Sequence, residues 1–271
     1  MTTPHPQAPL RMYWWRPWSP LRGNFGDELG PYLVDALFGI RTVWAEPDTC
    51  EIAAAGSIIE ILLSSKSTNR PVLWGSGMFW DSSGVVAADE FEITALRGCL
   101  TRARITDLDT EVALGDPGLL AHALLKSAPR KQYSLGIVPH FLDADRPAVT
   151  QLRTWPDVKI IDVTDPAPEV VREIAECHYI LSSSLHGLVV ADSVGTPNAY
   201  VAFSNDHRIG GPNKFHDYYS VFADPGRQLS VPLAGVLSGD TRSVAAEVER
   251  GYRAPDDLTT ITDRLVKAFP R

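Results

Sequence analysis

The sequence predicts an α/β protein made of two Rossmann-like domains that face each other across a cleft. Short apolar runs alternate with helical patterns over most of the 271 residues, which is typical of parallel strands covered by helices. The segment 126–132, KSAPRKQ, interrupts this alternation with proline and charge, and the alternation then starts again. We therefore expect one domain over residues 1–130 and a second over residues 131–271.

In the first domain, glycine-containing turns follow the expected strands. The strands are expected at 11–15, 52–55, 72–74, 93–96 and 112–114, with helices at 27–38 and 58–63. Leu29, Leu33 and Leu37 share one face of the first helix, as in a helix that packs on a sheet.

In the second domain, the same alternation predicts further strand–helix pairs. The strands are expected at 133–138, 158–163, 179–182 and 199–202, with helices at 146–154, 168–176, 185–194, 213–222 and 257–268. Prolines open the helix at 168–176, where proline is tolerated in a first turn. We expect the last helix, 257–268, to pack back on the first domain.

The formal net charge of −8 bears on the partners of the protein. Nucleic acid is disfavoured, because phosphate backbones attract clustered lysine and arginine. An anionic substrate would have to be held by a local basic cluster against this acidic background.

Several features of the sequence indicate a cytoplasmic location. The three cysteines are widely spaced and form neither a zinc pattern nor a disulfide framework. No apolar run reaches the roughly 20 residues of a membrane helix, and residues 1–10 show no secretory pattern. Trp14, Trp15 and Trp18 leave peripheral contact with the inner face of the membrane open, although strand core explains at least one of them.

The candidate site residues stand at strand-to-helix junctions, because ligands of open parallel sheets lie beyond the carboxyl ends of the strands. The candidates for substrate contact are Asn24, Gly26, Asp27, Ser76, Gly77, Asp116, His140, Ser183, Ser184, Leu185 and Gly187.

Two of these junctions are rich in glycine. In GNFGDELG, residues 23–30, the turn can expose backbone N–H groups to an anion or a sugar hydroxyl, or Asp27 can simply cap its helix. In GSGMF, residues 75–79, the small residues allow either close approach of a ligand or a tight connection. Neither stretch is a Walker loop or a GxGxxG fingerprint.

The junction SSSLHG, residues 182–187, carries the main candidate for a catalytic group. His186 lies in the first turn of an apolar helix, at the positive end of its macrodipole. A bound dianion there would favour the charged imidazolium, which suits a general acid. The alternative is a histidine that packs and bonds to a neighbouring strand.

Arg97 and Lys214 are the candidate cations. Arg97 follows a strand and can fork onto a phosphate or a carboxylate, whereas Arg102 and Arg104 are ordinary helix charges. Lys214 opens the helix NKFHDYYSVF as a second cation, or is simply an exposed lysine. We expect no metal, because there is no HExxH motif and no cluster with ligand spacing, and no serine hydrolase, because GxSxG is absent.

Read in order, these segments resemble the polysaccharide pyruvyltransferase family. The segments that carry the resemblance are GNFGDELGPYLV, GSGMF, LRGCLT, LGDPGLL, GIVPH, SSSLHGLVVADSVGTP and NKFHDYYSV, spread from Tyr13 to Val221. The family implies a fold similar to the glycosyltransferase B type. We then expect the acceptor on the first domain and the donor on the second.

The resemblance also implies a reaction. Pyruvate passes from phosphoenolpyruvate to two hydroxyls of a sugar in a cell-surface glycan or exopolysaccharide, or in its lipid-linked precursor, which gives a cyclic ketal and phosphate. His186, at the family's Leu-His-Gly position, is the implied acid. Arg97, at its Arg-Gly-x-x-Ser/Thr position, and Lys214 are the implied clamps for phosphate or carboxylate, and no cofactor is needed.

The chain departs from the family at Ser184, where many members have an arginine. A second cation for the donor is then expected from Arg208 or Lys214. Two alternatives stay open. One is a nucleotide-sugar glycosyltransferase of the same fold, with Asp192 recruited to hold a ribose. The other is a glycan-binding descendant without catalysis.

Overall fold

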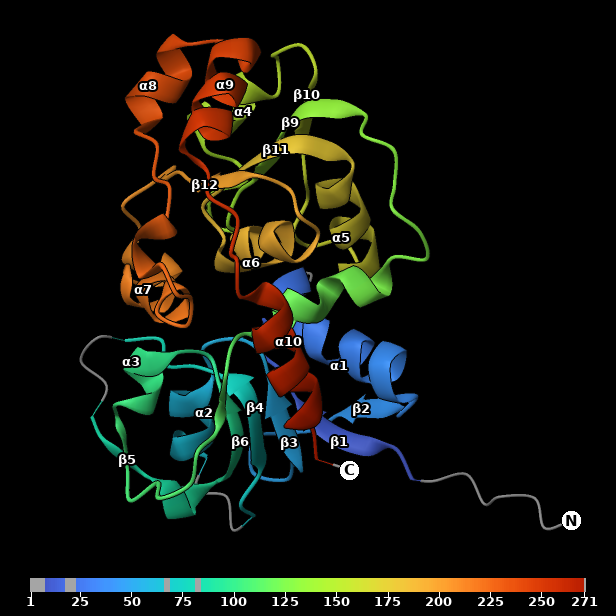
Figure 1. The fold of residues 1–271 in the computed structure, drawn as a ribbon, viewed down its shortest axis with the longest axis vertical. Coiled ribbons are helices and arrows are strands. Elements are labelled where there is room, and N and C mark those ends of the chain that lie inside the picture. Colours follow the sequence, from blue (N-terminus) through green and yellow to red (C-terminus); the bar gives the residue numbers. More distant parts are fainter. Residues whose placement is uncertain (1–7, 18–22, 66–68, 81–83, 271) are drawn as a thin grey trace, which may run out of the picture.

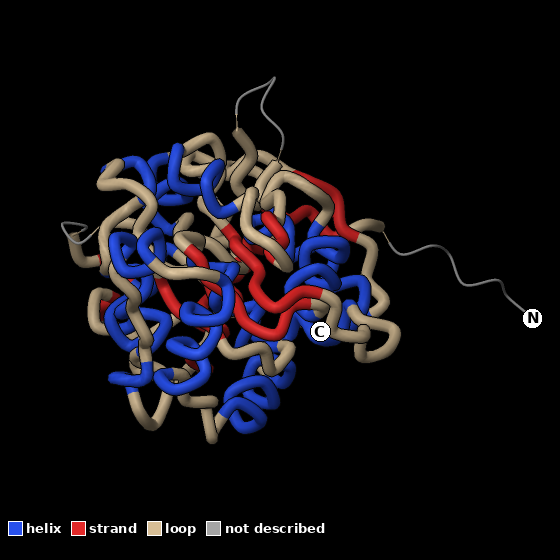
Figure 2. Tube along the Cα trace, turned by 90° about the horizontal axis from the view of Figure 1, so that it is seen from above, coloured by secondary structure: helices blue, strands red, loops and turns tan. Residues whose placement is uncertain are grey.

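The computed structural model describes residues 8–17, 23–65, 69–80 and 84–270, so Trp18 lies outside it. Two parallel sheets lie one above the other, with a layer of helices between them (Figure 1). Seen from above, helices surround the strands, which run through the interior (Figure 2). The predicted α/β class with parallel sheets is confirmed.

The first sheet is built from residues 10–114, and all of its strand pairs are parallel. In spatial order its strands are β2 (Thr42–Trp44), β1 (Leu10–Tyr13), β3 (Ile52–Ala54), β4 (Val72–Ser76), β6 (Glu92–Leu96) and β8 (Ala113–Leu114). Two short strands, β5 (Val86–Ala87) and β7 (Ile105–Thr106), pair beside it.

The second sheet is built from residues 133–200 and is also parallel. In spatial order its strands are β10 (Val158–Ile160), β9 (Tyr133–Val138), β11 (Cys177–Ser182) and β12 (Asn198–Tyr200). The strand β9 has the predicted bounds. The strand expected at 158–163 ends early, because the Asp162 side chain accepts the Thr164 N–H in a local turn.

The helices form the layer between the sheets and the two outer layers (Figure 1). Between the sheets lie α1 (Phe25–Phe38), η2 (Pro117–Leu124), α5 (Ala167–Ala175), α6 (Leu185–Ser193) and α10 (Leu258–Lys267). The helix α2 (Ile59–Ser64) packs on the first sheet, and α3 (Cys99–Arg102) lies beside β6; beyond the second sheet are α4 (Pro147–Leu152), α8 (Leu233–Ser238) and α9 (Thr241–Gly251). The remaining elements are α7 (Asn213–Tyr219), η1 (Ala88–Glu90), η3 (His207–Ile209) and η4 (Pro225–Arg227).

A continuous core joins the two sheets through the middle layer of helices. Met12 and Trp74 of the first sheet and Ile180 of the second belong to the same buried cluster, together with Leu188 of α6. Burial of such side chains is the main favourable term in folding. No helix of the described residues is long and apolar enough to cross a membrane.

The last helix returns to the first sheet. The Trp74 indole on β4 donates a hydrogen bond of 2.8 Å to the Leu265 carbonyl of α10. Phe269 stacks on Phe38 of α1 with a centroid distance of 4.0 Å and meets Trp74 edge-on. The chain end is therefore fixed to elements formed near its beginning.

The buried carboxylate of Asp192 connects α6 to the later helices of the second half of the chain. Asp192 on α6 accepts two hydrogen bonds from the Arg227 guanidinium, at 2.8 and 2.9 Å. It also accepts from the hydroxyls of Tyr218 and Tyr252, at 2.7 and 2.9 Å, and from the Asn198 amide at 2.8 Å. Both carboxylate oxygens are thus fully used in linking α6 to α7, η4 and α9.

We predict that Asp192→Ala is strongly destabilising, because it leaves the buried Arg227 guanidinium and two tyrosine hydroxyls without their acceptor. The expected loss is about 3–5 kcal/mol of unfolding free energy, measured by urea denaturation. Asp263→Ala on the exposed face of α10 is the control, with a change within about 0.5 kcal/mol. Equal stabilities for the two variants would contradict this role.

Candidate active site

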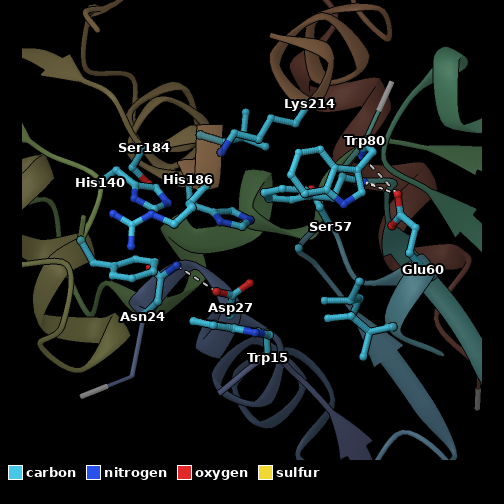
Figure 3. Close-up of a pocket in the computed structure, with 17 residues that line it drawn as sticks. Trp15, Asn24, Asp27, Ser57, Glu60, Trp80, His140, Ser184, His186 and Lys214 are labelled. Carbon is cyan, nitrogen blue, oxygen red and sulfur yellow. Dashed lines mark hydrogen bonds between the residues drawn. The ribbon is translucent and has the colours of Figure 1, made fainter. Parts of the chain in front are cut away.

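A pocket of about 330 Å³ lies where the carboxyl ends of strands from both sheets meet (Figure 3). Its polar lining comes from Asn24, Asp27, Ser57, Glu60, His140, Ser184, His186, Arg208 and Lys214. Its apolar lining comes from Trp15, Ile58, Ile61, Phe79, Trp80, Phe141 and Leu185, and Gly56 completes the wall. The size and the mixture of aromatic and convergent polar groups are typical of a small-molecule site.

His186 faces a buried carboxylate. It is the second residue of α6 and only 6% exposed, and its Nε2 lies 3.5 Å from Oδ2 of Asp116. Neither atom has another partner in the described part of the chain. Oδ1 of Asp116 accepts the Gly118 N–H at 2.8 Å, which fixes the carboxylate at the start of η2. Asp116 therefore holds the orientation of the imidazole.

The charge of Asp116 suits this contact. Burial by itself raises the pKa of the Asp116 carboxyl, but the facing His186 and the Gly118 N–H outweigh it and hold the pKa below its ordinary value. An ionised Asp116 is a good acceptor for a proton on Nε2 of His186.

The first turn of α1 supports the other side of the imidazole. A Cβ built on Gly26 would lie 2.2 Å from Nδ1 of His186, so the ring occupies the space that glycine leaves. Phe25 meets the ring edge-on at 6.5 Å. Gly26, which the sequence suggested as a substrate-contact residue, is contacted here by the side chain of His186.

Asp27 faces the pocket rather than capping its helix. The N-cap of α1 is Asn24, whose side chain also donates to Oδ2 of Asp27 at 2.8 Å (Figure 3). Burial raises the pKa of Asp27 to about 6, and the nearby His186 and Lys214 only partly offset this effect. Asp27 is thus a carboxyl that titrates close to neutral pH on the pocket wall.

Lys214, expected as a second cation of the site, is buried, so the alternative of an ordinary exposed lysine is wrong. It is 6% exposed, its ammonium donates to the Ile209 carbonyl, and it lies 5.8 Å from the ring centroid of Phe79. Burial, with a contribution from the charge of Arg97, lowers its pKa to about 8. A bound anion would stabilise the charged ammonium at this position.

Arg97 is fully buried and is not part of the pocket lining. Its Nε donates to Oδ2 of Asp217 on α7 at 2.9 Å, and its Nη2 donates to the Met78 carbonyl at 2.8 Å. Its Nη1 donates to the Ser57 hydroxyl, which does line the pocket. In this structure Arg97 thus joins β6 to the helix that carries Lys214. Its role as a phosphate or carboxylate ligand stays a prediction.

The predicted substrate-contact residues fall into two groups. Asn24, Asp27, His140, Ser184 and Leu185 line the pocket, whereas Gly26, Ser76, Gly77, Asp116, Ser183 and Gly187 are not part of its lining. A Cβ on Gly77 would lie 2.3 Å from Cζ of Arg97, and one on Gly187 would lie 2.2 Å from the Ser182 hydroxyl. These glycines leave room for neighbouring side chains.

His140 is a neutral donor at the pocket. Burial lowers its pKa to about 3, and the charge of Lys214 contributes. Its Nδ1 accepts the Leu142 N–H at 3.3 Å, which leaves the proton on Nε2. The Ser183 hydroxyl accepts the backbone N–H of His140 and donates to the Asp143 carboxylate, both at 2.8 Å. Ser183 therefore fixes the turn that carries His140.

Several lining residues were missed from the sequence. Ser57 follows a strand in a Gly-Ser pair, which is the same signal that selected the other junctions. Glu60 lies on α2 and accepts the N–H groups of Phe79 and Trp80, at 2.8 and 3.2 Å. No local pattern distinguishes Glu60 from an ordinary helix charge. Among the described residues, no three His, Cys, Asp or Glu side chains are placed to hold a metal.

Comparison with known sequences identifies the family. A sequence model described as polysaccharide pyruvyl transferase matches residues 114–205, which contain Asp116, His140 and His186. An uncharacterized protein of Acanthamoeba polyphaga mimivirus is 30% identical over 207 residues, which are 73% of this chain and 71% of that protein. The chain belongs to the polysaccharide pyruvyl transferase family.

The chain is also similar to the succinoglycan biosynthesis protein ExoV of Rhizobium meliloti (strain 1021). It is 29% identical over 228 residues, which are 80% of this chain and 67% of that protein. The resemblance expected from the ordered motifs is therefore confirmed.

We predict that Gly26→Ala destabilises the protein although alanine is the better helix former. The added methyl would overlap the His186 ring, and such overpacking costs about 1–3 kcal/mol, more than the ~1 kcal/mol that helix propensity contributes. Urea denaturation measures the change. The control is Gly235→Ala on α8, where a Cβ meets nothing within 4 Å and stability should rise. A stabilised Gly26→Ala would contradict the packing described.

We predict that Asp27→Asn stabilises the protein at pH 7. The pKa of Asp27 is raised from 3.8 to about 6, so the folded state binds more protons than the unfolded state between these values. The contribution of Asp27 to stability therefore falls as the pH rises through this range. The expected gain is about 1–2 kcal/mol at pH 7 and shrinks toward pH 4. Denaturation at both pH values measures it, and a less stable Asp27→Asn at pH 7 would contradict the shift.

Proposed function

We propose that the protein transfers pyruvate from phosphoenolpyruvate to two hydroxyls of a sugar, giving a cyclic ketal and phosphate. The observation that carries the proposal is the buried Asp116–His186 pair beside a pocket that contains the buried cation Lys214. Family membership and the likeness to a succinoglycan biosynthesis protein support a glycan acceptor, in a cell-surface or exopolysaccharide precursor.

The donor fits the second half of the pocket wall. Phosphoenolpyruvate carries a phosphate and a carboxylate, and Lys214 is placed to neutralise one of them. His140 can donate from Nε2, and Arg208 provides a second guanidinium in the lining, although it is paired with Asp206 at 2.6 Å. In this proposal these groups supply the positive charge and hydrogen bonds for the donor that an arginine at position 184 would otherwise supply. The acceptor then lies toward the first sheet, in a two-domain arrangement similar to the glycosyltransferase B type.

His186 supplies the acid step in this proposal. Protonation of the methylene carbon of the donor makes C2 electron-poor, and a sugar hydroxyl adds there. A second hydroxyl then displaces phosphate. Asp116 holds the imidazole in place, while Lys214 offsets the charge that develops on the leaving phosphate. The reaction takes place in the cytoplasm and uses no cofactor in this proposal.

The glycosyltransferase alternative loses its candidate residue. Asp192 would have to hold a ribose, but its two oxygens accept five hydrogen bonds from Arg227, Tyr218, Tyr252 and Asn198. A purely binding descendant would not need a buried carboxylate against His186, whose desolvation is costly. The pyruvyltransferase proposal assigns a role to the buried Asp116–His186 pair and needs no ribose ligand at Asp192.

The test separates donor binding from turnover. Calorimetry with phosphoenolpyruvate should give unchanged affinity for His186→Ala within about threefold, whereas its kcat falls by about 10²- to 10⁴-fold. Lys214→Met should weaken donor binding by about 10- to 100-fold, since a charge-assisted contact is worth about 1.5–3 kcal/mol. Turnover is measured as phosphate release and as the mass of a ketal, with a panel of nitrophenyl hexosides as acceptors.

Lys267→Met is the matched control, because Lys267 is an exposed lysine on α10. It should bind phosphoenolpyruvate as the wild type does. Absence of ketal across the panel, together with stabilisation by nucleoside diphosphates and not by phosphoenolpyruvate, would overturn the proposal.

A further inference from the structure

Ketal formation requires a base as well as an acid, because each attacking hydroxyl must lose its proton. This inference rests on the proposed pyruvyl transfer. The titratable side chains of the described pocket lining are Asp27, Glu60, His140, His186, Arg208 and Lys214. His186 is assigned as the acid, and the two cations cannot accept a proton while charged.

The other candidate bases are already engaged. Oε1 of Glu60 accepts two backbone N–H groups, from Phe79 and Trp80, so this side chain fixes the loop that follows β4. Nδ1 of His140 accepts the Leu142 N–H, and burial together with the charge of Lys214 lowers the pKa of its ring to about 3. An imidazole with so low a pKa is a weak base at neutral pH.

Asp27 has both a free oxygen and the required position. Only its Oδ2 is bonded, to the Asn24 amide, and no partner for Oδ1 is found in the described part of the chain. Figure 3 shows its carboxylate directed into the pocket, on the opposite side of the cavity from Lys214. Gly56 lies behind it, because a Cβ there would be 2.8 Å from Oδ1. The carboxylate is therefore backed by the wall and open to the cavity.

The groups that face Asp27 leave it able to change its protonation state. His186 and Lys214 favour its ionised form and Asp116 opposes it, while burial raises its pKa to about 6. The Tyr13 hydroxyl on β1 stays protonated, since burial and the charge of Asp27 raise its pKa to about 12. Asp27 is then mostly ionised at pH 7 and still basic enough to take a proton.

We infer that Asp27 is the general base that takes the proton of the first attacking sugar hydroxyl. As the hydroxyl O–H bond breaks, its electron pair forms the new bond to C2 of the donor. The C2=C3 electron pair takes a proton from His186, which turns the methylene into a methyl group. The carboxyl of Asp27 holds the hydroxyl proton.

The second half of the reaction restores both groups. The C2–O bond to phosphate breaks with its electron pair on phosphate, which takes the proton from Asp27. The second hydroxyl adds to C2 and gives its proton to the neutral His186. Two hydroxyl protons are lost, one methyl proton and one phosphate proton are gained, and Asp27 and His186 return to their starting states.

The assignment places the acceptor sugar at the amino-terminal end of α1, between Asp27 and the aromatic rim. Trp15 and Phe141 stack at 5.8 Å on this wall of the pocket and offer a flat apolar surface. The first hydroxyl therefore approaches C2 from the first sheet, while the donor anion stays with Lys214.

The experiment compares Asp27→Asn with Asp35→Asn, an exposed aspartate two turns further along α1. With phosphoenolpyruvate and the hexosides of the panel above, Asp27→Asn should keep donor affinity within about threefold and lose about 10²- to 10⁴-fold in kcat. The rate of the wild type should fall as the pH drops through about 6, because Asp27 becomes protonated. The residual rate of Asp27→Asn should lack this acidic limb, and Asp35→Asn should match the wild type.

The outcomes separate this inference from the proposed function. A wild type that makes no ketal with any hexoside and does not bind phosphoenolpyruvate overturns the proposed function and the base with it. An active wild type with Asp27→Asn within threefold of its kcat, and with an unchanged pH profile, overturns the base alone. A variant that loses donor binding in the same measure as kcat would make Asp27 a binding residue and would also overturn the inference.

Discussion

The ion pair between Arg97 and Asp217 joins the first sheet to the helix that carries the only lysine of the described pocket lining. Both side chains are fully buried, and the Arg97 Nε donates to the carboxylate at 2.9 Å. Asp217 also accepts the N–H and the hydroxyl of Thr101, at 2.8 and 2.6 Å, so the pair is well supplied with hydrogen bonds. A buried pair is tolerated only under such conditions, because desolvation of two charges is costly. At Gly98, α7 comes so close that a Cβ would lie 1.9 Å from the Asp217 carbonyl.

The pocket is a place where stability and chemistry oppose each other. Asp27 and Lys214 are both held in environments that disfavour their charged forms, and each lowers the stability of the folded protein near neutral pH. Natural proteins keep such costs where the groups are used. The same burial makes a carboxylate more basic and an ammonium more responsive to an anion, which are the properties that a proton-transfer site needs.

The strands of the second sheet could be predicted from the sequence, whereas the long-range side-chain contacts around the pocket could not. The strand β9 and the junction before α6 follow from local apolar runs and turn residues, and the rule for carboxyl ends of parallel strands then predicted most of the polar wall. The partner of Arg97 was out of reach, because Asp217 lies 120 residues away and nothing local marks it. The helices α8 and α9 were also missed, since their short patterns lie in a polar segment after the last expected strand.

The separation of Arg97 and Asp217 in the sequence explains why Arg97 was predicted to bind a substrate phosphate or carboxylate. An arginine at a strand end is expected to point into the cleft, but whether it meets a substrate or a carboxylate of the protein depends on how the two halves pack. In the described pocket lining, the buried positive charge comes from α7, through Lys214. The position of α7 depends on Arg97 and Asp217. Arg97 is outside the pocket lining and reaches it only through the Ser57 hydroxyl, yet it determines where Lys214 is placed in the pocket.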